Sequence, residues 1–388
     1  MKKRVLAFIP TFPVLSETFI EREIAGLAKS PNIDLTVVAP NKGLDFAQKT
    51  LEGHVKYKQA NLLDGAIGLT LLLTKAANVF KAWKTVGVLR PYEFIKGFGY
   101  ARIFRQYKPE VIYSHFLSKP STVALVASIL LDVPLVISGH ARDVLEYPDL
   151  IIKKAKLAKS ITFCNKNALE SVKSKVDPSL HSKLKLIYHG VDPKSLALPN
   201  GTSFKKPDQP FIFTIGRLEE KKGIKYLIEA SEILKKEVSH LIYVAAGGPL
   251  LGELKSLIKS KGLEKSFVLL GETPFNEILP YLHAADVYVQ PSINAQGGDA
   301  DGVPNSLIEA AMLKVPIVTT DAGSISDFLN SSNALIVPQK DSVKLAEAIK
   351  KLLSDTDLRN SLSSAAYNKA VGMFDLEESV SEIESLLV

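Results

Sequence analysis

The chain of 388 residues is too long for one ordinary hydrophobic core, so its length predicts two domains. Its hydrophobic content of 46% and charged content of 23% are those of a globular protein that folds in water. The single cysteine, Cys164, excludes an internal disulfide and a cysteine metal cluster, and it indicates a reducing compartment. Because Cys164 ends an apolar run, we expect it to be an inert core residue.

The net charge of +7 conceals an asymmetry between the two halves. Residues 1–200 carry 29 Lys and Arg against 16 Asp and Glu, a balance of +13, whereas residues 201–388 carry 19 against 25, a balance of −6. Basic and aromatic residues interleave at helical spacing between Lys75 and Lys108. That pattern suits an anionic membrane surface or an anionic acceptor, and it equally suits a solvated basic face over an aromatic core. No recognition motif indicates nucleic acid as a partner.

The first ten residues superficially resemble a secretory signal, but Pro10 and Pro13 interrupt the apolar stretch and acidic residues follow at once. We interpret them instead as a first strand, Val5–Ile9. No apolar run approaches the roughly 20 residues that span a bilayer; Asp64 and Lys75 bracket the best candidate. We therefore expect a cytoplasmic protein, either free or peripheral at the inner face of the membrane.

Short apolar runs alternate with amphipathic segments through the first half, which predicts a parallel sheet covered by helices on both faces. The strand-like runs are Val5–Ile9, Leu35–Ala39, Val111–Ser114, Leu135–Ser138, Ser160–Cys164 and Leu184–Tyr188. The helix-like runs are Phe19–Lys29, Pro120–Leu131 and Asn167–Lys175.

The segment Pro193–Pro210 is rich in Pro, Ser and Lys and has no periodicity, so it predicts a linker. After it the alternation of strands and helices restarts, with strand-like runs at Phe211–Ile215, Leu241–Ala245, Phe267–Leu270, Val287–Gln290 and Pro316–Thr319. We therefore predict an α/β fold of two Rossmann-like, doubly wound domains. They comprise residues 1–195 and 211–370, with a linker over 196–210 and a final helix over 371–388 that packs back on the N-terminal domain. Ligands of such sheets bind at the carboxyl ends of the strands, which places the expected site in the cleft between the domains.

The stretch from Asp301 to Glu309 places one carboxylate just before a predicted helix and a second one eight positions later. Between them, Gly302 and Pro304 suit a tight turn and a first helical position. A helix N-terminus presents unpaired N–H groups and is suited to hold a phosphate. Two carboxylates flanking a diphosphate are suited to bind ribose on one side and a sugar on the other. The stretch favours a nucleotide-sugar site, although an ordinary turn before a helix has the same local pattern.

Two further loops follow predicted strands of the second half. The loop that opens at Gly216 contains Arg217 and Lys222, which are suited to neutralise a diphosphate. Gly247 and Gly248, after the next strand, permit close approach of the backbone to a ligand or form a plain turn. We expect the intervening charged residues of the first loop to be solvated: Glu219, Glu220 and Lys221.

Loops of the first half carry candidates for the acceptor side. His140 and Asp143 follow a predicted strand and are suited to hydrogen-bond a sugar, although a lone histidine is as often structural. The turn His189–Asp192 is interpreted as a structural turn or hinge. Ser16 and Glu17 precede a helix and suit a capping arrangement, or they face the cleft.

Taken together, these segments resemble the retaining glycosyltransferases of family 4, which have the GT-B fold. The matching segments are Gly216–Leu218 with Lys222–Gly223, Gly247–Pro249, Leu270–Gly271, Ala284–Ser292, the pair Asp301 and Glu309, and Pro316–Gly323. The first half matches more loosely, through His140 and Asp143, and Phe12–Ile20 resembles the subset that builds exopolysaccharide or capsule. The sequence has no Walker loop, dinucleotide fingerprint, Ser-His-Asp order or His/Cys metal spacing.

The resemblance implies a role for each matching residue. Arg217 and Lys222 would hold the donor diphosphate, Glu309 the ribose and Asp301 the transferred sugar, with His140 near the reacting sugar. The donor-binding backbone would be that of Gly216, Gly247, Gly248, Gly302, Val303, Pro304 and Asn305. It implies transfer with retention of configuration, no dedicated base, no bound metal, and no cofactor beyond the nucleotide-sugar donor. The acceptor, a glycan or lipid-linked glycan, would bind the N-terminal half near Ser16, Glu17 and Asp143.

Four positions depart from the pattern of the family. Asp301 and Asp327 stand where Glu is usual, and Ala141 and Lys314 stand where Gly is usual. None of the four removes a phosphate ligand, so we expect activity with either a UDP-sugar or a GDP-sugar. Two other functions stay open: a sugar-nucleotide epimerase on the same fold, and a nucleotide-sugar-binding protein without catalysis.

Overall fold

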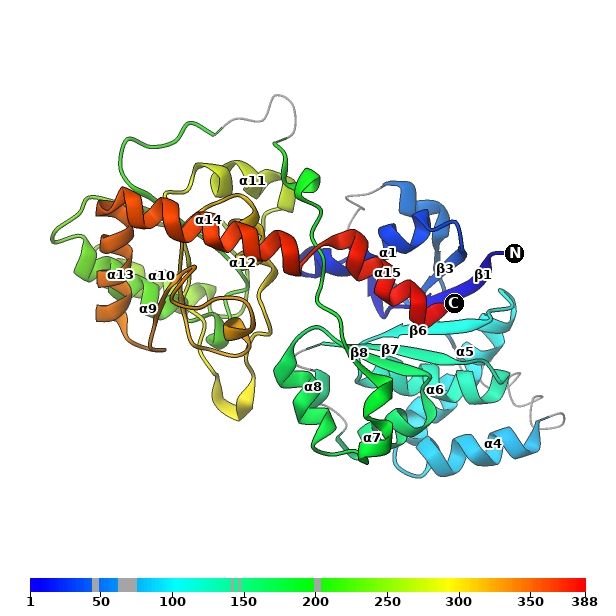
Figure 1. Ribbon diagram of the computed structural model, residues 1–388. Helices are drawn as coiled ribbons and strands as arrows, with labels where there is room; N and C mark the ends of the chain where they lie inside the picture. The colour runs from blue at the N-terminus through cyan, green and yellow to red at the C-terminus, as the bar shows by residue number, and fades with distance from the viewer. Residues whose placement is uncertain (44–48, 62–74, 141–142, 146–147, 199–203) are drawn as a thin grey trace. The chain divides into compact units, whose positions relative to one another are not determined.

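The computed structural model describes residues 1–43, 49–61, 75–140, 143–145, 148–198 and 204–388. Its contacts divide the chain into two compact units, one of Met1–Gly190 with Leu376–Val388 and one of Val191–Asp375. Each unit contains a parallel sheet with helices on both faces (Figure 1), which confirms the predicted α/β fold. Ala141, residues 62–74 and residues 199–203 of the predicted linker lie outside the described residues.

The N-terminal unit is built on a sheet of seven strands in the order β5-β3-β1-β6-β7-β8-β9, in which every neighbouring pair is parallel. The strands are β1 (Lys3–Phe8), β3 (Ile33–Ala39), β5 (Val55–Tyr57), β6 (Val111–His115), β7 (Leu135–Gly139), β8 (Ser160–Phe163) and β9 (Leu184–Leu186). The helices are α1 (Thr18–Lys29), α4 (Ala76–Ala82), the π-helical η3 (Trp83–Gly87), α5 (Pro91–Arg105), α6 (Lys119–Leu131), α7 (Pro148–Leu157), α8 (Lys166–Lys173) and α15 (Leu376–Leu387). A separate small pair joins β2 (Thr11–Phe12) to β4 (Asn41–Lys42).

Successive residues of β1 face two different helix layers. Leu6 and Phe8 belong to the core cluster that includes residues of α5, α6, α7 and α8, whereas Val5 and Ala7 belong to the cluster that includes α1 and α15. Because side chains alternate along a strand, burial of both faces requires the nearly continuous apolar runs from which the strands were predicted. The edge strand β5 escaped prediction because only Val55 of its three residues is buried.

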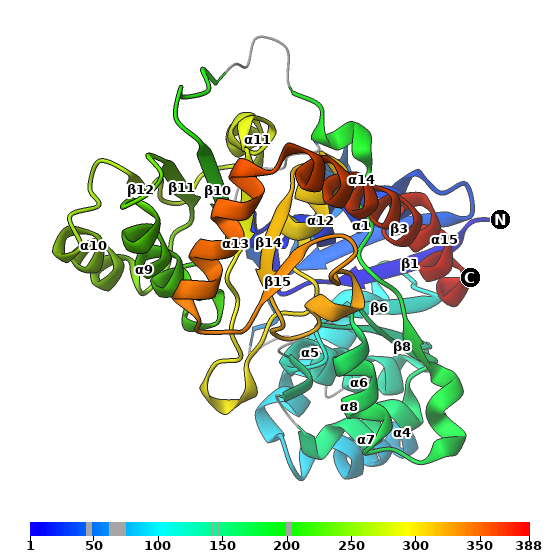
Figure 2. The ribbon, with the colours of Figure 1, turned by 60° about the vertical axis from the view of Figure 1, so that its left-hand side comes forward.

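The C-terminal unit repeats this plan on a parallel sheet of six strands in the order β12-β11-β10-β13-β14-β15 (Figure 2). The strands are β10 (Phe211–Ile215), β11 (Leu241–Ala245), β12 (Phe267–Leu269), β13 (Val287–Gln290), β14 (Ile317–Thr320) and β15 (Leu335–Val337). The helices are α9 (Ile224–Leu234), α10 (Leu251–Ser260), α11 (Phe275–Ala284), α12 (Asn305–Met312), α13 (Ser342–Ser354) and α14 (Thr356–Met373). One face of this sheet packs against α9, α10 and α13.

The last helix of the chain, α15, packs on α1 in the N-terminal unit. Val380, Ile383 and Leu387 share one core cluster with Ile20 and Ile24 of α1. The Asn32 amide donates to the Glu384 carboxylate at 2.7 Å. A Cβ atom added to Gly26 would lie 2.5 Å from a methyl carbon of Val380, so the glycine sets the spacing between the two helices.

Substitution Gly26→Ala should therefore destabilise the protein by about 1–3 kcal/mol, because a stiff, β-branched side chain on α15 would have to move. The measurement is the free energy of unfolding in denaturant. Gly372→Ala in α14 is the matched control, since a Cβ there meets nothing within 4 Å and should not destabilise. Equal effects of the two substitutions would contradict the close packing of α1 on α15.

Candidate functional site

Loops at the carboxyl ends of β10 and β13 meet in the C-terminal unit because these two parallel strands are neighbours. After β10 the chain forms the short helix η7 (Glu220–Lys222), which ends at Gly223 with φ of +64°. A Cβ atom on Gly223 would lie 1.9 Å from the carbonyl oxygen of Pro291 after β13. Only glycine allows both the left-handed backbone and this approach, so Gly223 determines where Lys222 stands.

Lys222 and Asp301 form a buried ion pair. The Lys222 Nζ lies 3.0 and 2.9 Å from the two carboxylate oxygens of Asp301. The Ser292 hydroxyl donates a further bond of 2.8 Å to the same carboxylate. The side chains are 14% and 8% exposed, so little water screens the pair. Two residues that the sequence assigned to phosphate and sugar are thus held within one ion-pair distance.

A second lysine joins this pair, contrary to the prediction that it is solvated. Lys221 has a side chain only 10% exposed; its Nζ lies 3.1 Å from the Asp299 carboxylate and 4.0 Å from that of Asp301. The prediction was wrong because η7 turns Lys221 inward, toward the segment that carries both acids. The sequence did contain a signal for this pairing: two adjacent lysines, Lys221 and Lys222, match two closely spaced acids, Asp299 and Asp301.

Arg217 differs from both lysines because it remains open to solvent. Its side chain is 51% exposed, and its guanidinium lies 3.0 Å from Glu219. Glu220 is exposed, as predicted. An exposed ion pair contributes little to stability, so the guanidinium is available to an anionic ligand at small energetic cost.

A chain of buried polar side chains supports Asp301 from behind. The Tyr288 hydroxyl donates to the Gln290 side-chain oxygen at 3.1 Å, and the Gln290 amide donates to the Ser292 hydroxyl at 2.9 Å. Burial raises the pKa of Tyr288 above its ordinary value, so this hydroxyl keeps its proton. Because each side chain of this network is hydrogen-bonded to the next, the network fixes the orientation of Ser292 and hence that of Asp301.

Helix α12 begins at Asn305. Pro304 has φ of −59° and ψ of 128°, so it precedes the helix instead of occupying its first position. Gly302 and Val303 are half-buried, and the side-chain oxygen of Asn305 is buried with no hydrogen-bond partner among the residues that the structure describes. Glu309 is 3% exposed on α12.

The two glycine loops also come together. The N–H of Leu218, two residues after Gly216, donates to the carbonyl of Gly247 at 2.7 Å. Gly248 has φ of +147°, and a Cβ there would lie 2.7 Å from the backbone nitrogen of Leu218. The structure thus brings together Gly216 with Gly247, and Lys222 with Asp301.

The departure at Lys314 has a structural explanation. Lys314 has φ of +55°, the left-handed region that favours glycine, the residue usual here in the resembling family. Its ammonium lies 4.6 Å from the centre of the Tyr367 ring, a cation–π contact that offsets part of the strain.

In the N-terminal unit, the Asp143 carboxylate accepts hydrogen bonds from the backbone of two loops. Its Oδ1 accepts the N–H of His140 at 2.8 Å, and its Oδ2 accepts the N–H of Leu117 at 2.5 Å. The fully buried Lys154 donates to the carbonyl of the same Leu117, and burial lowers the pKa of its ammonium to about 7. Both Asp143 oxygens are therefore engaged in holding the two strand-end loops, after β6 and after β7.

His140 lies among other rings at the end of β7. Its ring stacks with those of His115 and His189, with distances between ring centroids of 5.9 and 5.3 Å. The centroid of the Phe19 ring lies 5.2 Å away. Burial lowers the pKa of His140 to about 3, so the imidazole is neutral at neutral pH. Cys164, predicted to be an inert core residue, is half-buried directly after β8.

The acceptor-side candidates near the first strand lie in and beside η1 (Leu15–Glu17). Ser16 is exposed and Glu17 is half-buried. Glu17 occupies the residue before α1 but makes no side-chain bond to the first turn, so the predicted capping arrangement is wrong.

Removing the partner of a buried carboxylate leaves its charge uncompensated. We expect Lys222→Met to lower the free energy of unfolding by about 3 kcal/mol, and Asp301→Asn combined with it to recover part of that loss. Denaturant unfolding of the single and double variants measures the coupling. Lys344→Met is the control, because the Lys344–Glu347 side chains are 57% and 58% exposed and should couple negligibly. Equal losses for the two lysines would contradict the burial of the Lys222–Asp301 pair.

Residues 201–369 match the family model described as "Glycosyl transferases group 1". The chain is similar to amylovoran biosynthesis glycosyltransferase AmsK of Erwinia amylovora, at 31% identity over 172 residues, which are 44% of this chain and 42% of that protein. It is also similar to putative teichuronic acid biosynthesis glycosyltransferase TuaC of Bacillus subtilis, at 27% identity over 288 residues, which are 70% of this chain and 68% of that protein. The match thus spans less than half of AmsK and about two thirds of TuaC.

Among solved structures, the chain is similar to that of Anabaena Alr3699/HepE in complex with UDP and glucose. The TM-score is 0.73 at 18% identity, and the match covers 99% of each chain. This likeness confirms the predicted GT-B fold. The family match confirms the predicted resemblance over residues 201–369.

Proposed function

We propose that the protein transfers a sugar from a nucleotide-diphosphate sugar to a glycan or lipid-linked acceptor in polysaccharide biosynthesis, because residues 201–369 match the family model described as "Glycosyl transferases group 1". The observation that carries this proposal is the ion pair of Lys222 and Asp301, together with the exposed Arg217 on the same loop as Lys222. It combines two cationic side chains, suited to a diphosphate, with a carboxylate suited to sugar hydroxyls. The relatives AmsK and TuaC are described as an amylovoran biosynthesis glycosyltransferase and a putative teichuronic acid biosynthesis glycosyltransferase, which supports the acceptor class.

The spacing within the cluster matches the chemistry of the donor. In a nucleotide sugar the transferred sugar is bonded directly to the diphosphate, so groups that bind these two parts must lie side by side. Lys222 and Asp301 are within 3.0 Å of one another. The structure of HepE with UDP and glucose supports a UDP-sugar as the donor.

The reaction then breaks the bond between the sugar and the diphosphate and forms one between the sugar and an acceptor oxygen. Negative charge develops on the leaving diphosphate, and the fixed cations Lys222 and Arg217 stabilise it in the transition state. The diphosphate itself accepts the acceptor proton, so the sugar is transferred to the same face and configuration is retained. No side-chain base is required in this scheme.

His140 contributes as a neutral hydrogen-bonding group. Since burial holds its pKa near 3, the ring does not change charge between pH 5 and 8. It would orient a sugar hydroxyl and would not act as the general acid. In the same scheme Glu309 on α12 binds the ribose.

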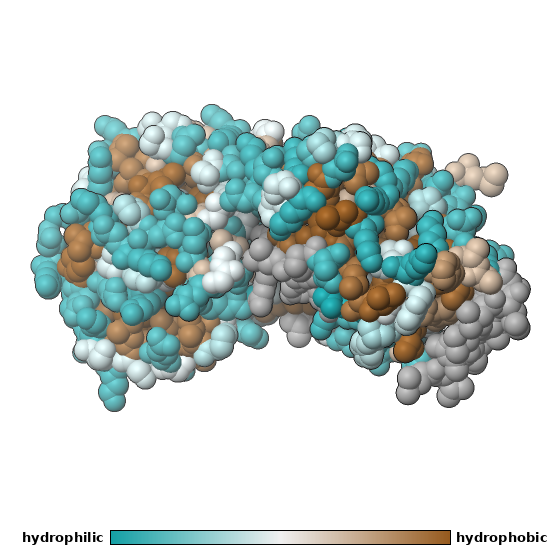
Figure 3. All heavy atoms as spheres, turned by 90° about the horizontal axis from the view of Figure 1, so that it is seen from below, coloured by the Kyte–Doolittle hydropathy of each residue, from teal (hydrophilic) through white to brown (hydrophobic). Residues whose placement is uncertain are grey.

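The N-terminal unit also carries a surface suited to an anionic membrane. On α4, η3 and the start of α5 the side chains of Phe80, Trp83, Val88, Tyr92 and Ile95 are between 44% and 64% exposed. The same stretch presents basic side chains, of which two lie against aromatic rings: Lys84 on Phe80 and Lys96 on Tyr92. Figure 3 shows hydrophobic side chains standing among hydrophilic ones on this unit.

The basic aromatic segment divides into a buried part and an exposed part. Phe98, Tyr100 and Phe104 are buried in the core, whereas Trp83 and Tyr92 are exposed. We propose that the exposed part, which we call the α4–α5 surface, binds the cytoplasmic leaflet where a lipid-linked acceptor resides. Among the described residues, no helix is long and apolar enough to cross a membrane.

Arg217→Ala should lower kcat/KM for sugar transfer by roughly 10²- to 10³-fold, as expected for loss of one group that stabilises transition-state charge. Because Arg217 is half exposed, its removal should leave the fold intact, so the loss reports on chemistry. Transfer is assayed with UDP-, GDP- and ADP-sugars, and Lys225→Ala, an exposed lysine on the adjacent α9, is the control.

Product analysis separates the alternatives. A new glycoside with retained configuration supports the proposal, whereas an epimerised sugar nucleotide formed without acceptor would replace it. Thermal unfolding in the presence of UDP measures nucleotide binding independently of turnover. A ligand at about 100 times its Kd adds roughly 2.7 kcal/mol to the free energy of unfolding. Nucleotide binding without any turnover would indicate a binding protein.

Charge reversal on the α4–α5 surface should weaken vesicle binding. Each lysine near an anionic surface contributes about 1 kcal/mol, so Lys81→Glu, Lys84→Glu and Lys96→Glu together should weaken binding to phosphatidylserine vesicles at least 100-fold. The control carries the same change in net charge on exposed lysines of the C-terminal unit: Lys344→Glu, Lys350→Glu and Lys351→Glu. If both triple variants lose vesicle binding to the same extent, the α4–α5 surface is not a specific membrane-binding surface.

A further inference from the structure

Three ligand-type side chains converge at the carboxyl edge of the N-terminal sheet. His140 directly follows β7, Cys164 directly follows β8, and His189 lies three residues after β9. The strands β7, β8 and β9 are parallel neighbours. Because parallel strands end at a common edge, residues far apart in the sequence meet there.

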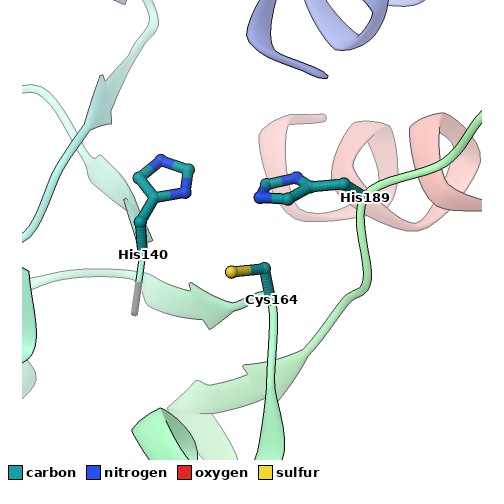
Figure 4. Close-up of side chains that lie close together, drawn as sticks. All are labelled: His140, Cys164 and His189. Carbon is teal, nitrogen blue, oxygen red and sulfur yellow. The ribbon is translucent and has the colours of Figure 1, made fainter. Parts of the chain in front are cut away.

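The three groups face one another. One ligand atom from each of His140, Cys164 and His189 can be chosen so that all lie within 4.8 Å of one another. Figure 4 shows the two imidazole rings and the thiol pointing into one shared space. The three groups come from three different loops, so no local turn accounts for their convergence.

His140 lacks the partners that a buried imidazole requires. It is 9% exposed, and both of its ring nitrogens are buried with no hydrogen-bond partner in the described part of the chain. A buried polar group left unsatisfied costs about 1–3 kcal/mol. A sugar hydroxyl could supply a hydrogen bond to the His140 ring. It would not explain why the Cys164 thiol and the His189 imidazole lie close to that ring.

We propose that His140, Cys164 and His189 bind a single zinc ion. Two imidazole nitrogens and a thiolate are ligands that zinc prefers. Zinc bonds of about 2.0–2.3 Å require side-chain shifts of roughly 1 Å from the observed arrangement, within the reach of χ rotations. Three protein ligands leave a fourth position for water or a ligand.

A hydrogen bond also positions the thiol of the cluster. The Asn165 amide donates to the Cys164 sulfur at 3.6 Å, so a neighbouring side chain helps to hold the sulfur in place beside the two imidazole rings.

Occupancy of this site would oppose sugar transfer, a consequence that rests on the proposed function. That function uses the His140 ring to orient the reacting sugar, and a zinc ion would engage the same ring. The site would then act as a zinc-dependent brake, separate from the diphosphate site in the other unit.

The first test measures binding alone, without donor or acceptor. Full-length protein freed of metal with EDTA is titrated with zinc against a chromophoric chelator, and cobalt replaces zinc for spectroscopy. We expect one equivalent to bind, with a thiolate-to-cobalt charge-transfer band. Cys164→Ser, nearly isosteric, should abolish the band and weaken zinc binding at least tenfold, as should His189→Ala.

His181→Ala is the control, since that half-buried ring lies at the Lys173 carbonyl and contributes nothing to the cluster. Absence of stoichiometric binding, a cobalt spectrum without the thiolate band, or unchanged binding in Cys164→Ser would overturn the proposal. Unfolding in denaturant confirms that each variant is folded before titration.

A second test separates this proposal from the proposed function. Zinc should inhibit transfer by the wild-type protein at the concentration at which it binds, and the inhibition constant should rise at least tenfold in Cys164→Ser. If zinc binds but does not inhibit transfer, the zinc site is confirmed and its inhibitory role is rejected. A protein that binds zinc but transfers no sugar would reject the function and leave the site standing.

Discussion

Parallel pairing of the strands is the constraint on which both candidate sites depend. A parallel sheet places all of its carboxyl ends at one edge, so the loops that follow neighbouring strands are obliged to meet. In the C-terminal unit this joins the loop after β10 to the segment after β13, and hence Lys222 to Asp301. In the N-terminal unit it joins the ends of β7, β8 and β9. The chemistry of each site follows from which side chains occupy those few positions.

Burial then changes what these side chains can do. Lys221 and Lys222 lie in a poorly solvated place, where carboxylates 3.1 and 2.9 Å away pair with their ammonium groups. Burial lowers the pKa of His140 to about 3 and also lowers the pKa of His189, so both rings are neutral at neutral pH. The same desolvation thus gives one unit fixed positive charge, suited to a diphosphate, and gives the other unit neutral imidazoles, suited to hydroxyls or a metal ion. A division of this kind fits a transferase whose donor is anionic.

Much of the framework was predictable because it rests on local patterns. Apolar runs located β10, β11 and β13 to the residue, since both faces of each strand are buried and the run must be continuous. Short edge strands such as β5 were missed because a half-exposed strand of three residues has no pattern to detect. Lys221 was misjudged for a different reason: its burial depends on a turn held by Gly223 against Pro291, a contact between segments almost seventy residues apart.

The sequence by itself determined the fold class, the order of strands and helices, and the residue types available for phosphate and sugar, because periodicity and composition are properties of the chain alone. Tertiary structure decided which of those residues are paired, buried or free. It engaged both oxygens of Asp143 in backbone hydrogen bonds, left Arg217 in solvent, and brought Cys164 beside two histidines. The physical reason is that pairing and desolvation depend on distances through space, and a sheet sets those distances between residues that the sequence keeps far apart.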